Sequence, residues 1–435
     1  MVYGIINRDL VKLAESGKRI GVGLVGAGNM GTDIISQISR MKGLKTVAVA
    51  DIRLDYAYRG YELAGYRRAD IVEAKTPGQA DEMARQGRPV VTEDGSLLTR
   101  MDEVDVLIEA TGNPGVGARL AWEAIANGKH IVMMNVETDV TVGPILNRLA
   151  RQSGVVYTLT AGDEPGSIME LYDFCDALGL RVVCAGKGKN NPVNFDATPD
   201  MYAEEAAGRD LTPEMLVEFI DGSKTMIEMA AVANATGLVP DVPGMHGPTT
   251  TLAKLKEVFA LKSQGGILNK EGVVDWAIGD IAPGVFVIAT TDQERLIQCL
   301  RLRDMGCGPN YLFYRPYHLC SMETPLSAAA AVLYGQATMF PRERLVAEVT
   351  AIAKRDLRPG EVLDGIGGYS YRCSIVTREE AKAKNALPAG LAKGAKVLAP
   401  IKKGETIRYD QVEVPESFLL QLRKMQDMVT EDWKS

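Results

Sequence analysis

Two lysines and two amide side chains lie close together near the middle of the chain and could bind an anion. Lys187, Lys189, Asn190 and Asn191 stand in the segment GKGKNNPVN at 186–194, directly after an apolar run at 181–185 that predicts a strand. Ammonium and amide groups donate hydrogen bonds to phosphate and carboxylate oxygens. We expect this segment to contact a phosphorylated small-molecule substrate. Such a composition after a strand is also typical of a solvated loop.

Two adjacent acids form a second candidate group. Asp163 and Glu164 precede an amphipathic segment at 167–175 that predicts a helix. They could cap that helix, hold a divalent cation or transfer a proton. Neighbouring side chains on an extended chain point to opposite sides, so we do not expect both carboxylates as ligands of one cation.

Further residues of the middle region have both a structural and a chemical interpretation. Lys224 and Glu228 are four residues apart in a predicted helix over 215–234, which is typical of a surface ion pair. A pocket role for Lys224 is the alternative. His318 is one of three histidines, and it is interpreted as a structural side chain or as an acid–base group.

A glycine-rich turn near the start of the chain predicts a dinucleotide site. The sequence GAGNMG at 26–31 follows an apolar strand at 22–25 and precedes a helical segment at 32–38. In this arrangement the first glycine allows a tight turn, the second admits the pyrophosphate and the third lets helix and strand pack closely. The residues expected around the pyrophosphate are Gly26, Gly28, Asn29, Met30 and Gly31.

The next strand bears on the choice of cofactor. Asp51 ends an apolar run at 46–50, where an acid reads the ribose hydroxyls of NAD. Arg53, two residues later, could instead receive the 2′-phosphate of NADP. These residues alone leave both cofactors open.

The remaining strands and helices of the first region alternate. Strands are predicted at 90–91, 104–110 and 130–134, with helices at 57–64 and 118–127. In parallel sheets ligands bind at the carboxyl ends of strands. Thr111, Gly112 and Asn135 follow such ends, and we expect them to line the nicotinamide half of the site, although ordinary loops also contain these residue types.

The pattern predicts an α/β protein with three consecutive domains. Residues 1–161 form a Rossmann domain with a doubly wound parallel sheet, and 162–336 an α+β catalytic and dimerisation domain. Residues 337–435 are rich in Gly and Pro turns and predict a small β-rich domain. Two similar phrases, LRPGEVL and IKKGETI, start 44 residues apart and indicate a pseudo-symmetric pair of turns.

Composition excludes several classes of protein. The 435 residues carry a formal net charge of −7, which argues against a general binder of nucleic acids or anionic membranes. The first residues lack the basic flank and long apolar core of a signal peptide, so we expect none, and no apolar run approaches the length needed to span a bilayer. The six cysteines include no CxxC pair, so reduced thiols in a cytoplasmic protein are expected. We also expect the protein to be a homodimer.

The order of these motifs resembles a known family. GLVGAGNMG, VAVADIR, VDVLIEATGNP, GKHIVMMNVE and GDEPG are similar to the first half of homoserine dehydrogenases. Those enzymes present a lysine after the asparagine that ends the last strand, whereas here Asn135 is followed by Val136 and Glu137, which argues against homoserine as substrate. Residues 355–415 resemble a SAF module, the β-clip of sialic acid synthases. The combination resembles the 1-deoxy-D-xylulose 5-phosphate reductoisomerase-like proteins of some bacteria.

That resemblance implies an NADPH-dependent reductoisomerase that makes 2-C-methyl-D-erythritol 4-phosphate, an isoprenoid precursor. It implies that Lys187, Lys189, Asn190 and Asn191 hold the phosphate, that Asp163 or Glu164 binds Mg²⁺ or Mn²⁺, and that Arg53 contacts NADP. Two alternatives stay open. One is a simple NAD(P)-dependent dehydrogenase of a sugar acid or hydroxy acid, and the other is a nucleotide-sensing protein whose SAF-like module binds a partner.

Overall fold

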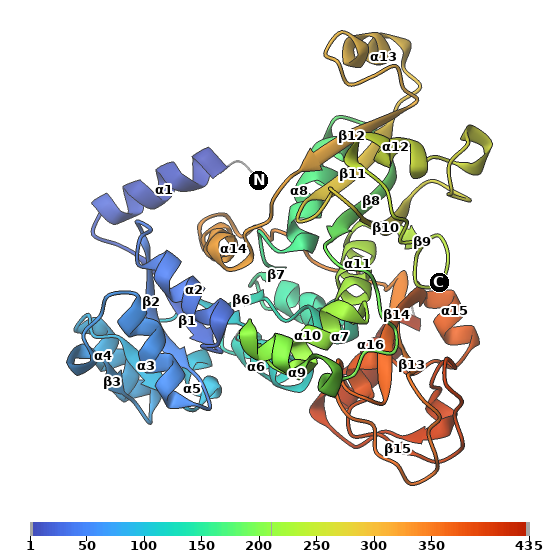
Figure 1. Cartoon of the computed structure of the whole chain (residues 1–435). Helices are drawn as coiled ribbons and strands as arrows, with labels where there is room; N and C mark the ends of the chain where they lie inside the picture. Colours follow the sequence, from blue (N-terminus) through green and yellow to red (C-terminus); the bar gives the residue numbers. More distant parts are fainter. Residues whose placement is uncertain (1–2, 210, 432–435) are drawn as a thin grey trace. The chain divides into compact units, whose positions relative to one another are not determined.

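The computed structural model describes residues 3–209 and 211–431, and the chain divides into two compact units (Figure 1). Unit 1 contains residues 1–166, 319–343 and 417–435, and unit 2 contains residues 167–318 and 344–416. Each unit is therefore built from separated segments of the chain. The three consecutive domains predicted from the sequence divide the chain at different points.

Unit 1 is built around a seven-stranded sheet in which every strand pair is parallel. The strand order is β3-β4-β2-β1-β5-β6-β7, which confirms the predicted doubly wound α/β fold. Strand β1 is buried along its whole length, as its continuous apolar sequence requires. The bounds are β1 Ile20–Val25, β2 Leu44–Ala50, β3 Val72–Glu73, β4 Val90–Thr92, β5 Val106–Glu109, β6 His130–Met133 and β7 Tyr157–Leu159.

Helices from distant parts of the chain complete unit 1. Helix α14 joins the same apolar core as β1 and β5 through Ala328, Ala329 and Ala330. Helix α16 contacts α7, where Gln426 accepts a hydrogen bond from the backbone N–H of Ile145 at 3.2 Å. The bounds are α1 Tyr3–Glu15, α2 Asn29–Ile38, α3 Leu54–Leu63, α4 Pro77–Arg85, α5 Gly95–Thr99, α6 Pro114–Ala126, α7 Val136–Gln152, α14 Cys320–Tyr334 and α16 Phe418–Glu431.

Unit 2 contains a mixed five-stranded sheet in the order β12-β11-β8-β10-β9. Strand β8 pairs in parallel with β10 and antiparallel with β11, which agrees with the predicted α+β character. The strands are β8 Arg181–Lys189, β9 Val239–Pro240, β10 Val273–Ile278, β11 Val285–Thr290 and β12 Asn310–Arg315. The helices are α8 Glu164–Ala177, which begins in unit 1, α9 Pro199–Gly208, α10 Pro213–Ile220, α11 Ser223–Thr236, α12 Leu255–Val258 and α13 Glu294–Arg301.

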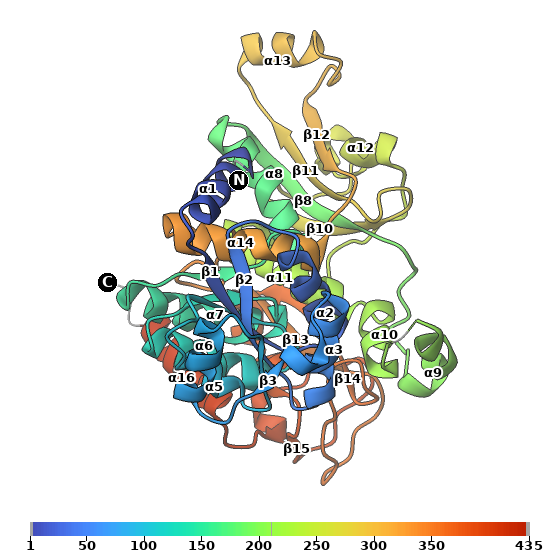
Figure 2. The ribbon, with the colours of Figure 1, turned by 90° about the vertical axis from the view of Figure 1, so that its left-hand side faces the viewer.

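The single helix predicted over 215–234 is wrong, because the chain forms α10 and α11 there. Gly222 separates them with a φ of 82°, a left-handed conformation that glycine adopts without steric cost. The apolar pattern continues through both helices, so periodicity alone did not reveal the break. Helix α13 lies at the end of the arm formed by β11 and β12, as both views of the ribbon show (Figures 1 and 2).

The C-terminal part of unit 2 is a small β-rich module, as predicted. It contains β13 Ala347–Ala353 paired with β14 Tyr371–Thr377, helix α15 Arg378–Ala383, and β15 Lys396–Val397 paired with β16 Val412–Glu413. The two similar phrases pair with each other through an antiparallel bridge between Leu357 and Ile401. Gly360 and Gly404 have φ values of 92° and 84°, which confirms the pseudo-symmetric turns. No helix among the described residues is long and apolar enough to cross a membrane.

Candidate active site

The glycine-rich turn has the geometry that a dinucleotide requires. Gly26 has a φ of 97°, and a Cβ atom on Gly31 would clash with the carbonyl oxygen of Gly26. Gly28 is exposed and caps α2, and a Cβ atom placed on it would meet nothing within 4 Å. Asn29 and Met30, both exposed, begin the helix. The open space over Gly28 and the N-terminal dipole of α2 fit a pyrophosphate.

Asp51 is fixed beside this turn. Its carboxylate accepts hydrogen bonds from the backbone N–H groups of Ala27 and Arg53, both at 2.8 Å. The guanidinium of Arg53 lies over the ring of Tyr56, 3.6 Å from its centre, and is exposed. Asp51 therefore sits where a ribose would be read, with an exposed cation two residues away. Asp51, which favours NAD, and Arg53, which favours NADP, are thus both positioned near the glycine-rich turn.

A buried carboxyl group lies next to the residues that we expect to line the nicotinamide half of the site. Glu109 ends β5 and accepts hydrogen bonds from the backbone N–H of Thr111, at 2.9 Å, and from its hydroxyl. Burial raises the pKa of Glu109 to about 7. Asn135 is also buried and caps α7 by accepting from the N–H of Thr138 at 3.1 Å. Gly112 adopts a φ of 67°, which lets the chain turn after Thr111.

Lys187 and Lys189 are part of strand β8, so the expectation that the strand ends at Ala185 is wrong. Gly186 precedes Lys187 and Gly188 lies between the two lysines, and the neighbours of both glycines leave no room for side chains. A Cβ atom on Gly186 would clash with the backbone of β10, and one on Gly188 with residues 281–282. The glycines thus allow close packing of the strand, and the lysine side chains share one face.

The ammonium group of Lys187 forms a buried ion pair with the carboxylate of Glu228 on α11. The prediction of a surface ion pair between Lys224 and Glu228 is wrong in placing Glu228 at the surface, because Glu228 is buried and pairs with Lys187 of β8. Lys224 is only partly exposed, in the first turn of α11. A buried charge requires such a partner to offset its desolvation.

Lys189 is held next to this pair. Its ammonium donates hydrogen bonds to the carbonyl of Phe219 at 2.5 Å and to the side-chain oxygen of Asn191 at 3.0 Å. Burial and the neighbouring charge of Lys187 lower the pKa of Lys189 to about 8. Asn190 is exposed at the end of the strand. The structure thus brings Lys187, Lys189 and Asn191 together, and Lys189 is poised between its charged and neutral forms near physiological pH.

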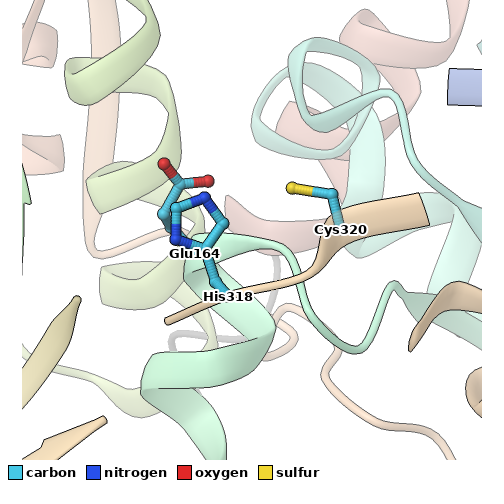
Figure 3. A group of neighbouring side chains, drawn as sticks. All are labelled: Glu164, His318 and Cys320. Atoms are coloured by element: carbon cyan, nitrogen blue, oxygen red, sulfur yellow. The ribbon is translucent and has the colours of Figure 1, made fainter. Parts of the chain in front are cut away.

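The predicted cation ligands lie where the chain passes between units. Within unit 1, the Sγ of Cys320 is 3.6 Å from a carboxylate oxygen of Asp163, and Glu164 and Cys320 offer ligand atoms within 4.8 Å of each other. The carboxylates of Asp163 and Glu164 also offer ligand atoms within 4.8 Å of each other, contrary to our expectation. The reason is that α8 begins at Glu164, so the chain is not extended there. Figure 3 shows Glu164 and Cys320 with His318, the last residue of unit 2.

Two histidines of unit 2, His318 and His246, lie next to oxygen atoms of other residues, and only His318 was considered from the sequence. His318 has its Nδ1 atom 2.7 Å from the carbonyl of Pro283. His246, not singled out in the sequence, lies between two carboxylates: its Nδ1 is 2.9 Å from Asp275 and its Nε2 is 3.5 Å from Asp241. The hydrogen bond to Asp275 raises the pKa of His246. The spacing of these residues in the chain carries no signal that would have grouped them.

Two protein families match successive parts of the chain. Residues 26–159 match "Homoserine dehydrogenase, NAD binding domain", and residues 162–324 match "Oxidoreductase DRL, catalytic domain". No curated protein matches the chain in sequence.

Several solved dehydrogenases are similar in structure. A probable dehydrogenase from Thermotoga maritima is 11% identical, with a TM-score of 0.41, covering 73% of this chain and 90% of its own. A myo-inositol dehydrogenase from Corynebacterium glutamicum is 10% identical with the same TM-score and coverage. A scyllo-inositol dehydrogenase from Lactobacillus casei, solved with NAD(H) and scyllo-inositol, is 12% identical, with a TM-score of 0.39, covering 74% of this chain and 91% of its own.

The family matches agree with the glycine turn in unit 1 and with the polar cluster in unit 2. The match to an NAD-binding domain covers the turn, Asp51, Thr111 and Asn135, and the match to a catalytic domain covers Lys187 and Lys189. The chain is an NAD(P)-dependent oxidoreductase with a homoserine dehydrogenase-like NAD-binding domain.

Proposed function

We propose that the protein catalyses hydride transfer between NADPH and a small anionic hydroxy or oxo compound, a sugar acid or sugar phosphate. The observation that best supports this proposal is the presence of two buried lysines, Lys187 and Lys189, on β8. Lys187 pairs with Glu228, and Lys189 remains beside it with a lowered pKa and hydrogen bonds to the neutral oxygens of Asn191 and Phe219. A phosphate or carboxylate would supply the missing negative charge.

Each residue then has a definite task. The turn at Gly26–Gly31 would hold the dinucleotide, and Arg53 would bind its 2′-phosphate. The nicotinamide, when bound, supplies or accepts the hydride. Lys189 would bind the substrate anion or donate a proton to the oxygen that gains charge, since its pKa of about 8 suits proton transfer near neutral pH. Remote binding of the anion positions the reacting carbon and lowers the entropic cost of the reaction.

A second candidate is the reductoisomerase reaction that the sequence resemblance implies. Reduction there follows rearrangement of a 2-keto sugar phosphate, and a divalent cation would polarise the hydroxyketone oxygens. The grouping of Asp163 and Glu164 in unit 1 favours this candidate, because carboxylates are the protein ligands that Mg²⁺ and Mn²⁺ take.

One assay tests both candidates. The purified protein is incubated with NADPH or NADH, with and without Mg²⁺ or Mn²⁺, and with a panel of sugar acids, hydroxy acids and sugar phosphates that includes 1-deoxy-D-xylulose 5-phosphate. Loss of absorbance at the nicotinamide band reports turnover, and product mass and carbon connectivity report rearrangement. Metal-dependent formation of a branched product supports the reductoisomerase, and metal-independent interconversion of a hydroxy and an oxo acid supports the dehydrogenase. Dinucleotide binding without turnover on any member overturns the proposal.

A further inference from the structure

A buried lysine of the C-terminal module forms a second ion pair in unit 2. Lys354 follows β13, and its Nζ lies 2.7 Å from a carboxylate oxygen of Asp221. The same ammonium donates hydrogen bonds to the carbonyls of Ala197, at 2.8 Å, and Gly368, at 2.9 Å. The side chains of Lys354 and Asp221 are 2% and 0% exposed. All three N–H bonds of the ammonium can therefore be used inside the protein.

Asp221 is the C-cap of α10 and directly follows its last residue, Ile220. Its carboxylate also accepts a hydrogen bond from the backbone N–H of Ser223 at 2.8 Å, across the left-handed Gly222. Burial raises the pKa of Asp221, and the charge of Lys354 opposes that rise. The pair thus fixes the segment 219–223, where α10 ends, the chain turns and α11 begins. We call this segment the 219–223 turn.

This turn contacts the candidate active site directly. The carbonyl of Phe219, two residues before Asp221, accepts a hydrogen bond from Lys189. After the turn, α11 carries Glu228, the partner of Lys187. A displacement of the turn would therefore move an acceptor of Lys189 and the counter-charge of Lys187 together.

Two further hydrogen bonds join the module to α11. The backbone N–H of Cys373 on β14 donates to the hydroxyl of Ser223 at 2.9 Å. The N–H groups of Val346 and Ala347 donate to the side-chain oxygen of Asn234, at 2.9 and 3.0 Å. The module therefore contacts both ends of the helix, and Lys354 is its charged contact with the turn.

We propose that Lys354 is a positioning residue for the substrate site and that the C-terminal module serves to hold the 219–223 turn against Lys189. This inference rests on the proposed function, since that function gives Lys189 its contact with the substrate anion. The module is thereby a part of the catalytic unit rather than an appended binding domain.

The proposal has an electrostatic consequence. The charged groups that act on Lys189 are Lys187, Glu228 and Asp221. Without Lys354, the buried carboxylate of Asp221 would take up a proton, because burial disfavours its charged form. Lys189 would then lose one attractive charge, and its pKa would fall below the value in the unchanged protein.

The test uses full-length Lys354→Met, Asp221→Asn and the double variant, with Lys402→Met as control. Lys402 belongs to the same module but pairs with Asp356 in solvent, at side-chain exposures of 72% and 59%. The pH dependence of Lys189 reactivity toward an amine-selective reagent is followed by peptide mass spectrometry, a measurement that needs no turnover. We expect the midpoint for Lys189 to fall by about half a pH unit or more in the three variants, and to stay unchanged in Lys402→Met.

Kinetics provide the second measurement. Lys354→Met should raise KM for the anionic substrate severalfold, whereas Lys354→Arg, which keeps the charge, should restore it. Unchanged Lys189 titration and KM in folded Lys354→Met overturn the inference. If that variant does not fold, the same result for Asp221→Asn overturns it. A shifted titration in a protein that turns over no substrate supports the positioning role while the proposed function fails.

Discussion

Lys187 and Glu228 form an almost fully buried ion pair inside unit 2, with side-chain exposures of 8% and 2%. The lysine comes from β8 and the glutamate from α11. Two charges removed from water in this way stabilise a protein only as long as both are present, because either one alone pays its full desolvation cost. The pair therefore fixes the register of α11 against the sheet.

Loss of the glutamate charge should destabilise the protein. In Glu228→Gln the ammonium of Lys187 stays buried and loses the charge of its partner on α11, so we expect the free energy of unfolding to fall by roughly 3–5 kcal/mol. Urea unfolding at pH 7 measures this. The control is Glu271→Gln, which removes the partner of Arg181 in a pair with exposures of 56% and 28%, and which should cost less than about 1 kcal/mol. Equal effects of the two substitutions would contradict the prediction.

Arg53 should decide between the two cofactors. Replacing it with serine removes the exposed guanidinium beside Asp51, and we expect the Kd for NADPH to rise about tenfold or more, equivalent to a loss of about 1.4 kcal/mol. The Kd for NADH should change less than about twofold, because NADH has no 2′-phosphate. Titration of nicotinamide fluorescence measures both. Arg67→Ser, which breaks an exposed pair with Asp70, serves as control. Equal losses for the two cofactors would remove Arg53 from this role.

Substrate affinity should depend on the protonation of Lys189. Its pKa is lowered to about 8, so the ammonium loses its charge as the pH rises through that value. We expect KM for the anionic substrate to increase between pH 7 and about pH 9, while Kd for the dinucleotide stays nearly constant. Lys189→Arg should keep low KM values to higher pH, since guanidinium remains charged. A KM that does not vary over this range would refute the assignment.

Glu109 should make stability depend on pH. Its pKa rises from 4.5 to about 7 in the folded protein, so the native state holds this proton more tightly than the unfolded state. The stabilisation of the protonated form is therefore lost as the pH rises from about 4.5 through about 7, at a cost of roughly 3 kcal/mol. Glu109→Gln, which cannot ionise, should remove much of this decline between about pH 4.5 and about pH 7 in chemical unfolding. The control is Glu103→Gln, since Glu103 is partly exposed and pairs with Arg85 at 3.1 Å. An identical decline in Glu109→Gln and the unchanged protein would count against the prediction.

The parts of the fold that depend on local sequence were predictable. The turn at Gly26–Gly31 was found because strand, glycines and helix follow one another within a few residues, and its conformation depends on those residues alone. Paired turns such as those at Gly360 and Gly404 were visible for the same reason.

The parts of the fold and of the site that depend on contacts between distant residues could not be predicted from the sequence. The alternation of Gly and Lys in 186–189 has no apolar period, and it forms a strand because β10 and β11 supply hydrogen bonds and close packing on both sides. Glu228 follows Lys187 by 41 residues, so the neighbouring Lys224 was the natural partner to consider. The pairing of Lys354 with Asp221 joins residues even further apart in the chain and leaves no local signal.

The division of unit 1 into three segments has a consequence for biosynthesis. Its core includes α14, and its helix α7 contacts α16, which begins at Phe418. Unit 2 likewise needs the module at 344–416 to complete the contacts of α11. A ribosome adds residues from the N-terminus onward, so nearly the whole chain must be translated before either unit can close its core. Truncation at residue 343 would leave both units unfinished, and neither can be produced as a simple N-terminal or C-terminal half.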